Sequence, residues 1–232
     1  MIAVNGAHRY VRNSEGHERQ SLSEKAYRRL EEMIVTLQLQ PGSVVTEGEL
    51  GLLMGIGRTP LREAIQRLAV QRLVTTLPRR GLVVNEINLM EHLDVLETRR
   101  VLDRLIASGA ARRATPDQRS LLQEYAGRMG TAARRGDLAE FMHLDQEFDL
   151  LLAESSRNSA AGHAIAPLHI HCRRFWYLHR HQGDLARAGQ LHEQLIKAVI
   201  EGDEQRAADA SDVLLQYLED FTRKALDLYL NR

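Results

Sequence analysis

The chain has 232 residues, 44% of them hydrophobic and 27% charged, which is the balance of a soluble globular protein with one large or two small domains. Its single cysteine, Cys172, excludes an intramolecular disulfide and indicates a reducing compartment. No stretch approaches the roughly 20 apolar residues of a membrane helix, and residues 1–20 lack the apolar core of a signal peptide. We therefore expect a cytoplasmic protein with no membrane partner.

Net charge is zero over the whole chain but is unevenly distributed. Residues 1–84 hold 12 Lys and Arg against 8 Asp and Glu, a net +4, whereas residues 85–232 hold 19 against 23, a net −4. A basic part followed by an acidic part suggests two different tasks. We expect a flexible N-terminal arm at 1–20, a first domain at 21–86 and a second domain at 87–232.

Two helices are predicted at the start of the first domain. Apolar residues recur at helical spacing across 23–37, and "QPGS" at 40–43 ends this helix in a turn. Thr46 followed by Glu49 forms a capping box, which predicts a short helix through Met54.

A third helix and a hairpin follow. "GIG" at 55–57 breaks the chain, after which Thr59 is expected to cap a helix that has Pro60 at its first position. Beyond Leu73, two short β-prone runs flank "PRRG" at 78–81, which predicts a hairpin turn with a basic tip. This order of elements is typical of a winged helix-turn-helix, whose third helix enters the DNA major groove with its N-terminal end first.

The start of the third helix suits an anionic partner. Arg58 and Arg62 can fork onto guanine edges or phosphates, and Thr59 with the free N–H groups of the first turn suits a phosphate. Arg79 and Arg80 on the wing can reach the DNA backbone or the minor groove. The predicted DNA-binding residues are Thr46, Arg58, Thr59, Arg62, Arg79, Arg80 and Gly81.

The stretch "LQPGSVVTEGELGLLMGIGRTPLREAIQRLAVQRLVTTLPRRGLVV" resembles the DNA-binding domain of GntR-family bacterial transcription regulators, over about residues 23–85. "RTPLREAI" and "PRRG" are its most specific parts. Gly57 stands where the family usually has Ser or Thr, which removes one phosphate contact. Gly48 stands where some members carry a basic or polar residue that touches DNA.

The second domain is predicted to be almost entirely helical. Proline is scarce, strand-like alternation is absent, and short connections between helices imply an antiparallel bundle. We expect helices near 89–113, 116–135, 137–156, 158–181, 185–202 and 203–230. The expected fold class is therefore mostly α, with a winged helix-turn-helix and a small β-hairpin wing followed by an all-α bundle.

Three polar residues fall on apolar helix stripes of this bundle. Arg99, Asp145 and His192 lie on stripes of the first, third and fifth helices, and Asp149 lies at the edge of the third. Buried charges are costly unless they are paired, hydrated or bound to an ion. The pattern therefore predicts either a polar cavity or a satisfied ion pair such as Arg99 with Asp145. The fourth helix, "PLHIHCRRFWYLHRH", suits a pocket wall because it is rich in arginine, histidine and aromatic residues.

This half is similar to the FCD domain of the FadR subfamily of GntR regulators. The stretches that carry the resemblance are "LETRRVLDRLIASGAARRATPDQ", "GDLAEFMHLDQEFDLLLAESSRN" and "LHEQLIKAVIEGDEQRAADA". The resemblance implies a six- or seven-helix domain that binds an effector and mediates dimerisation. Many members also hold a divalent metal there through one aspartate and three histidines.

Two of those metal positions match this chain. Asp145 and His192 match, Asp149 replaces the first histidine, and Leu214 stands in place of the last and cannot ligate a metal. The candidate ligands of one divalent ion of the Zn, Ni or Mn class are thus Asp145, Asp149 and His192, with His169 as a further candidate. The alternative is a metal-free pocket that binds the effector directly. The candidate effector-binding residues are Arg99, Asp145, Arg173, Tyr177 and His192.

The sequence therefore predicts a homodimeric regulator rather than an enzyme. We expect it to bind a short inverted-repeat operator in double-stranded DNA, as a repressor, under the control of a small carboxylate effector. Two alternatives stay open: an architectural DNA-binding protein without an effector, and, less favoured, a metal-dependent enzyme that uses the region of Asp145 and His192.

Overall fold

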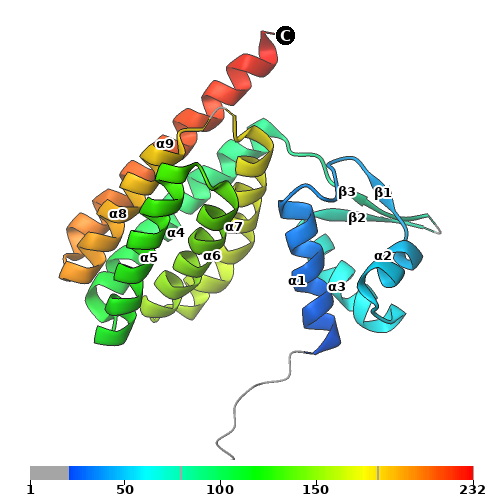
Figure 1. The fold of residues 1–232 in the computed structure, drawn as a ribbon, viewed down its shortest axis with the longest axis horizontal. Coiled ribbons are helices and arrows are strands. Elements are labelled where there is room, and N and C mark those ends of the chain that lie inside the picture. The colour runs from blue at the N-terminus through cyan, green and yellow to red at the C-terminus, as the bar shows by residue number, and fades with distance from the viewer. Residues whose placement is uncertain (1–20, 79, 182, 232) are drawn as a thin grey trace, which may run out of the picture.

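The computed structural model describes residues 21–78, 80–181 and 183–231, which fold around two hydrophobic cores (Figure 1). We call residues 21–86 the N-terminal unit and residues 87–231 the helical unit. The predicted arm at 1–20 and the wing residue Arg79 lie outside the described residues.

The N-terminal unit combines three helices with a small antiparallel sheet whose strand order is β1-β3-β2. Its elements are α1 (Leu22–Val35), β1 (Val44–Val45), α2 (Glu47–Met54), α3 (Arg58–Val70), β2 (Val74–Leu77) and β3 (Gly81–Val84). β2 pairs with β3 from Val74 opposite Val84 to Leu77 opposite Gly81. Apolar faces of the three helices and the sheet meet in one core, and the helix-turn-helix with its wing is confirmed.

The structure corrects three details of the sequence prediction. α3 begins at Arg58 with Gly57 as its N-cap, so the prediction that Thr59 caps this helix was wrong. Pro60 is therefore its third residue, where a missing backbone N–H is still tolerated. α1 ends at Val35 because Leu37 takes a left-handed backbone with φ 62°. The strand β1 was not predicted.

The helical unit follows the predicted order closely. Its helices are α4 (Leu89–Arg113), α5 (Pro116–Arg135), α6 (Leu138–Ser155), α7 (Ser159–His179), α8 (Leu185–Glu201) and α9 (Glu204–Leu230). Gly136 and Gly202 end α5 and α8 in the left-handed conformation, and the aspartates that follow them cap α6 and α9. This local chemistry explains why sequence reasoning placed the boundaries well.

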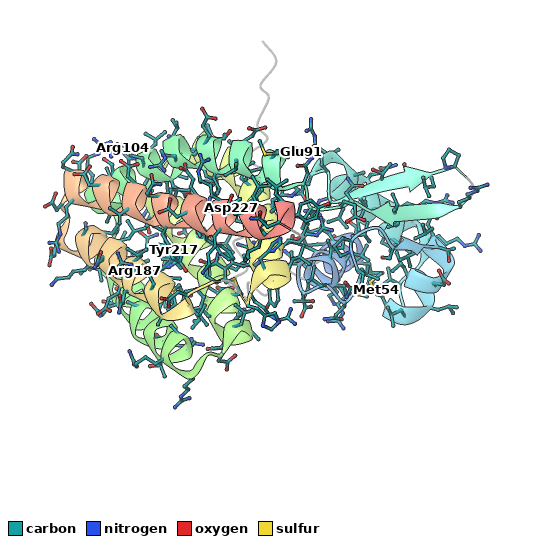
Figure 2. All side chains as sticks on the ribbon, turned by 90° about the horizontal axis from the view of Figure 1, so that it is seen from above. Met54, Glu91, Arg104, Arg187, Tyr217 and Asp227 are labelled. Carbon is teal, nitrogen blue, oxygen red and sulfur yellow. The ribbon has the colours of Figure 1, made fainter. Side chains whose placement is uncertain are left out.

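The long helices α4 and α9 pack along each other (Figures 1 and 2). Ion pairs along their shared edge join Arg100 Nη2 to Glu219 Oε1 at 2.8 Å and Arg104 Nη1 to Asp209 Oδ1 at 3.1 Å. Among the residues that the structure describes, no helix combines the length and the hydropathy that crossing a bilayer requires.

Candidate functional site

The turn between α2 and α3 presents the predicted DNA-binding residues to solvent. Thr46 accepts a hydrogen bond from the backbone N–H of Glu49, whose carboxylate accepts one from the backbone N–H of Thr46, so the capping box is confirmed. Gly55 ends α2 with φ 64°. Arg58 and Thr59 then stand exposed in the first turn of α3.

The N-terminus of α3 is open because Gly57 has no side chain to cap it. The unpaired N–H groups of a first helical turn and the positive end of the helix dipole favour an anion. Gly57, which stands where the family usually has Ser or Thr, thus leaves the backbone N–H donors of this turn available, with the Arg58 side chain beside them. This arrangement suits a DNA phosphate.

Arg62 lies one turn further along α3, and its Nε donates to Glu47 Oε2 at 2.8 Å. Both side chains are substantially exposed, at 63% and 36%, so the pair is worth less than about 1 kcal/mol and can be exchanged for a DNA contact. Arg62 and Glu47 line a groove of about 430 Å³ whose other wall is the wing, including Thr76 and Arg80. Recognition helix and wing therefore face the same groove.

Gly81 has a structural reason to be glycine. Its φ is 99°, and a Cβ atom there would lie 2.3 Å from the backbone oxygen of Val45 and 2.9 Å from Cα of Thr46. The first residue of β3 must let β1 approach closely, which a larger residue would prevent. This requirement holds whether or not Gly81 also touches DNA.

A chain of charged side chains crosses the interior of the helical unit. Arg99 Nε donates to Asp103 Oδ2 at 2.9 Å, and Asp103 Oδ1 lies 3.2 Å from His169 Nε2. The other ring nitrogen of His169 lies 2.9 Å from Asp149 Oδ2, which also accepts from Arg173 Nη1 at 3.3 Å. All five side chains are about nine-tenths buried.

A second buried pair lies beside this chain. His192 Nε2 is 3.0 Å from Asp145 Oδ1, and His192 Nδ1 donates to the backbone oxygen of Ala188 at 2.8 Å. The buried ion pair considered as an alternative, Arg99 with Asp145, does not form, because Arg99 pairs with Asp103 one turn away on its own helix. Asp103 is the residue of the candidate site that the sequence prediction missed, although its spacing from Arg99 was the available signal.

The charged partners of these groups oppose the effect of burial on their pKa values. Burial disfavours the charged form of His192, but its hydrogen bond to Asp145 and the charge of that carboxylate outweigh burial and raise the pKa of His192. Burial likewise opposes the charge of His169, and the carboxylates of Asp149 and Asp103 raise its pKa. For Asp103, burial would raise the pKa, but the charges of Arg99 and His169 lower it.

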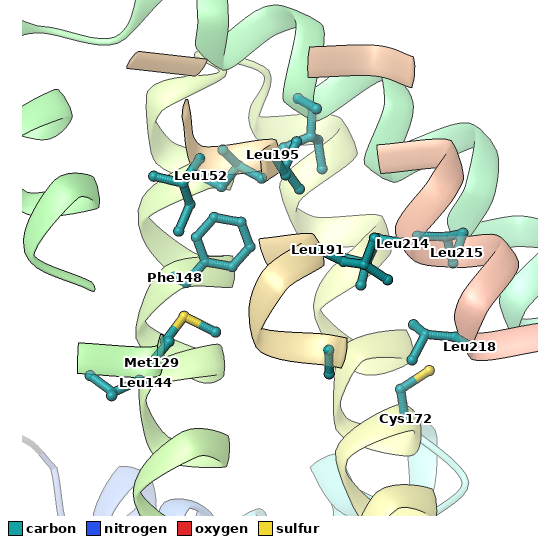
Figure 3. Packing of buried hydrophobic residues seen from close by; sticks show 14 of the residues in the cluster. Met129, Leu144, Phe148, Leu152, Cys172, Leu191, Leu195, Leu214, Leu215 and Leu218 are labelled. Carbon is teal, nitrogen blue, oxygen red and sulfur yellow. The ribbon is translucent and has the colours of Figure 1, made fainter. Parts of the chain in front are cut away.

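These side chains border a small cavity between α4, α6, α7, α8 and α9. Its volume is about 30 Å³, and its wall includes the predicted residues Arg99, Asp145, Asp149, Arg173 and His192. Leucines of α6, α8 and α9 close the apolar side, including Leu152, Leu195, Leu214, Leu215 and Leu218 (Figure 3). Tyr177, the remaining predicted effector residue, does not line this cavity but lies in a cleft toward the N-terminal unit.

The side chains around the cavity do not fit a metal ion in this arrangement. A histidine ligates a metal through a free lone pair on one ring nitrogen, but both ring nitrogens of His169 face carboxylates, and those of His192 face a carboxylate and a carbonyl. No group of three His, Cys, Asp or Glu side chains within the described ranges converges on a common point. Leu214 fills the remaining family position with a hydrocarbon.

α7 joins the cavity to the N-terminal unit. One face carries His169, Cys172 and Arg173 toward the charged interior. The other face packs Ile170 into the core of the N-terminal unit and directs His171 Nε2 to the backbone oxygen of Gln71 at 2.9 Å. The same helix therefore contacts both the cavity and the N-terminal unit.

Arg174 adds a contact of unusual character to this junction. Its side chain is 1% exposed, and Nη2 donates to the backbone oxygen of Asn85, in the segment that links the two units. Within the described part of the chain its Nε has no hydrogen-bond partner, and burial lowers its pKa to about 10. A buried guanidinium held by a carbonyl instead of a carboxylate leaves much of the cost of burying its charge uncompensated.

Two family models match the chain. Residues 22–84 match "Bacterial regulatory proteins, gntR family", and residues 94–217 match "FCD domain". The chain belongs to the GntR family. As a member with an FCD domain, it is a DNA-binding transcriptional regulator and not an enzyme.

Relatives of this GntR-family chain agree with that assignment. It is 30% identical over 179 residues to an uncharacterised HTH-type transcriptional regulator from an unstable DNA locus of Streptomyces ambofaciens, covering 76% of this chain and 75% of the relative. It is also 30% identical over 135 residues to the transcriptional repressor RspR of Escherichia coli K12, covering 58% and 59% respectively.

Solved structures share the fold of this GntR-family chain. Escherichia coli McbR/YncC matches with a TM-score of 0.80 at 18% identity, over 89% of this chain and 99% of that one. A GntR-type regulator from Rhodococcus sp. RHA1 matches with a TM-score of 0.68 at 20% identity, over 88% and 97%. The two-part architecture is therefore common to these proteins.

Proposed function

We propose that this chain is a homodimeric repressor that binds a short inverted repeat in double-stranded DNA. Its affinity for this operator would fall or rise when an organic acid enters the cavity. Two copies of α3 would read the two half-sites, so the symmetry of the operator would mirror that of the dimer. The repressor direction is supported by RspR, which carries that description.

The DNA-binding part of the proposal rests on the shared groove of α3 and the wing. Arg58 and the open first turn of α3 would hold a phosphate and enter the major groove, and Arg62 would leave Glu47 for a base edge. Arg80, exposed on the wing, would contact the neighbouring backbone. Arg79 precedes Arg80 in the sequence and stays a predicted contact.

The effector part rests on two buried guanidinium groups beside one small cavity. A carboxylate is the ligand that arginine recognises best, because the guanidinium fork matches both of its oxygens. A volume of about 30 Å³ holds one or two water molecules. An acid would therefore have to displace a side chain, and Asp149 is the candidate because its contact with Arg173 is long, at 3.3 Å.

The proposed effector binds without a resident metal. His169 and His192 already use both ring nitrogens, so the cations that face an acid are protein groups. Elemental analysis of the purified protein should find well under one transition-metal ion per chain. A stoichiometric ion that survives dialysis would contradict this part of the proposal.

The single observation that carries the proposal is the two-faced contact of α7. An acid that displaces Asp149 would shift the face bearing His169 and Arg173, and the opposite face, with His171 and Arg174, would move against the N-terminal unit. Couplings of this kind between two sites typically amount to about 1–3 kcal/mol, a 5- to 150-fold change in affinity.

Selection of binding sites from a random pool of duplexes tests the DNA-binding part. We expect an inverted repeat to be enriched, Arg62→Ala to relax the preference at defined positions, and Arg58→Ala to weaken binding across sequences. Arg29→Ala is the matched control, because Arg29 is exposed on α1 and, among the described residues, its ion pair is with Glu32 at 2.9 Å. Binding without any enriched sequence would instead favour an architectural protein.

A further inference from the structure

The cavity and a surface cleft share two wall residues. The cleft has a volume of about 420 Å³ and lies between α1 of the N-terminal unit and α6 and α7 of the helical unit; we call it the α1 cleft. Met142 and Arg173 line both the cavity and the α1 cleft. They are 4% and 6% exposed, so these two side chains separate the cavity from open solvent.

We infer that small molecules reach the cavity from the α1 cleft, through a gate formed by Met142 and Arg173. Both side chains are long and unbranched at Cβ, so rotation about their own bonds can open a passage. On the far side the wall is built from packed helix faces with residues such as Phe141, Phe148 and Leu195, which are at most 3% exposed. Opening those faces would require whole helices to separate. The more exposed wall residues Asp145 and Asp149, at 17% and 11%, lie on α6, the helix that carries Met142.

The contacts of Arg173 allow it to leave its inward position. It holds Asp149 through one contact of 3.3 Å, and the same carboxylate oxygen keeps a shorter contact of 2.9 Å with His169. When Arg173 turns away, Asp149 therefore keeps the His169 ring nitrogen as a partner. Removal of a charge from a buried pair is costly mainly when its partner is left alone, which does not happen here.

An acidic side chain in the α1 cleft can receive Arg173 in its outward position. Glu31 lies on α1, lines the cleft and is 6% exposed. Within residues 21–78, 80–181 and 183–231, Glu31 has no arginine or lysine nitrogen within 4 Å, whereas its neighbour Glu32 is already paired with Arg29. The cleft thus offers a carboxylate that has the Tyr27 hydroxyl as a neighbour but no cationic partner among the described residues.

Placement of the gate in this cleft makes entry depend on the position of the N-terminal unit. α1 forms one wall of the α1 cleft and moves with the unit that carries α3. A bound operator that fixes α1 would therefore alter how fast an acid enters, in addition to how tightly it binds. The inference rests on the proposed function in treating the cavity as the effector site, but its test needs no effector.

Cys172 supplies the test, because it is the chain's only cysteine, lines the cavity and is 4% exposed. Iodoacetamide is added to the native full-length protein, and the rate of Cys172 alkylation is followed by mass spectrometry. Met142→Ala should raise this rate about tenfold, because a smaller local opening of the structure would then be enough to expose Cys172. Ala139→Trp, an exposed substitution that fills the α1 cleft, should lower it several-fold.

Two matched controls separate the gate from general loosening. Leu214→Ala removes an equally buried side chain from the far wall of the cavity, on α9, and should accelerate alkylation much less than Met142→Ala. Ala160→Trp places the same bulk on an exposed position of α7 outside the cleft and should leave the rate unchanged.

The inference is overturned if Leu214→Ala accelerates as much as Met142→Ala, or if Ala139→Trp has no effect. Ala139→Trp changes a surface position, so this outcome can be read even if Met142→Ala does not fold. If the gate variants behave as expected but no acid alters DNA binding, the route stands and the proposed function fails. If instead the gate variants do not behave as expected but an acid does alter DNA binding, the proposed function stands and the entrance lies elsewhere.

Discussion

Replacement of Gly81 by alanine is expected to disrupt the wing in the absence of DNA. The new Cβ would lie 2.3 Å from the Val45 oxygen, and the residue would have to keep a φ of 99°. Backbone strain of this kind costs about 1–3 kcal/mol, and forcing β1 away from β3 adds about 1–3 kcal/mol. We therefore expect a loss of about 2–6 kcal/mol in the stability of the N-terminal unit, summing those two ranges.

Gly55→Ala is the matched control for this prediction. Gly55 also has a positive φ, 64°, but a Cβ there would meet nothing within 4 Å, so only the left-handed strain of about 1–2 kcal/mol applies. Denaturant unfolding followed by circular dichroism, together with hydrogen exchange of the amides around Val45, measures both variants. If Gly81→Ala costs no more than Gly55→Ala, the argument from the close approach of β1 is wrong.

Three further predictions concern charges and protons. Arg58→Ala and Arg62→Ala should each weaken specific DNA binding by about 1–3 kcal/mol in fluorescence anisotropy; an equal loss on random duplex would assign the residue to phosphate contact alone. Asp103→Ala leaves buried Arg99 without its carboxylate and should cost about 3–5 kcal/mol in denaturant unfolding. Glu32→Ala, which breaks an exposed pair, should cost less than about 1 kcal/mol, and similar losses for both would refute the burial argument. Burial, aided by the charge of Arg99, lowers the pKa of His92 to about 3. Below pH 6.5 the His92 side chain is therefore protonated in the unfolded chain but neutral in the folded chain. His92 should therefore cost about 1 kcal/mol of stability between pH 7 and pH 5.5, against the opposite contribution of His169 and His192, whose pKa values are raised. His92→Phe should be less destabilised than the wild type over this interval by that amount, and an unchanged pH profile in the variant would contradict this account.

Local chemistry made most of the helix boundaries predictable. Thr46 with Glu49, and the glycine–aspartate steps at 136–137 and 202–203, specify starts and ends through contacts only a few residues apart. The start of α3 was harder, because threonine is a good N-cap but the left-handed backbone of Gly55 turns the chain earlier and makes Gly57 the cap. β1 has only two residues and exists through its pairing with β3, a contact that no local pattern reveals.

The position of the candidate cavity could be predicted from the sequence, but the pairing of its charged side chains could not. The apolar stripes correctly indicated that Arg99 and His192 face the interior. Which carboxylate each would meet depends on the rotation and depth of every helix, and these are fixed by packing over long sequence distances. His169 in particular lies between two aspartates because α7 also has to bury Ile170 in the N-terminal unit. That second contact gives α7 its proposed role, and the sequence alone did not indicate it.

The most direct test of the account measures operator affinity while small carboxylic acids are titrated, for the wild type and for Arg173→Gln. We expect at least one acid to change the affinity of the wild type by 5- to 150-fold, the range of typical coupling between sites. Arg173→Gln should bind the acid-free operator like the wild type but lose the response. A response of equal size in the variant, or wild-type affinity that no carboxylate alters, would contradict the claim that the cavity controls DNA binding through α7.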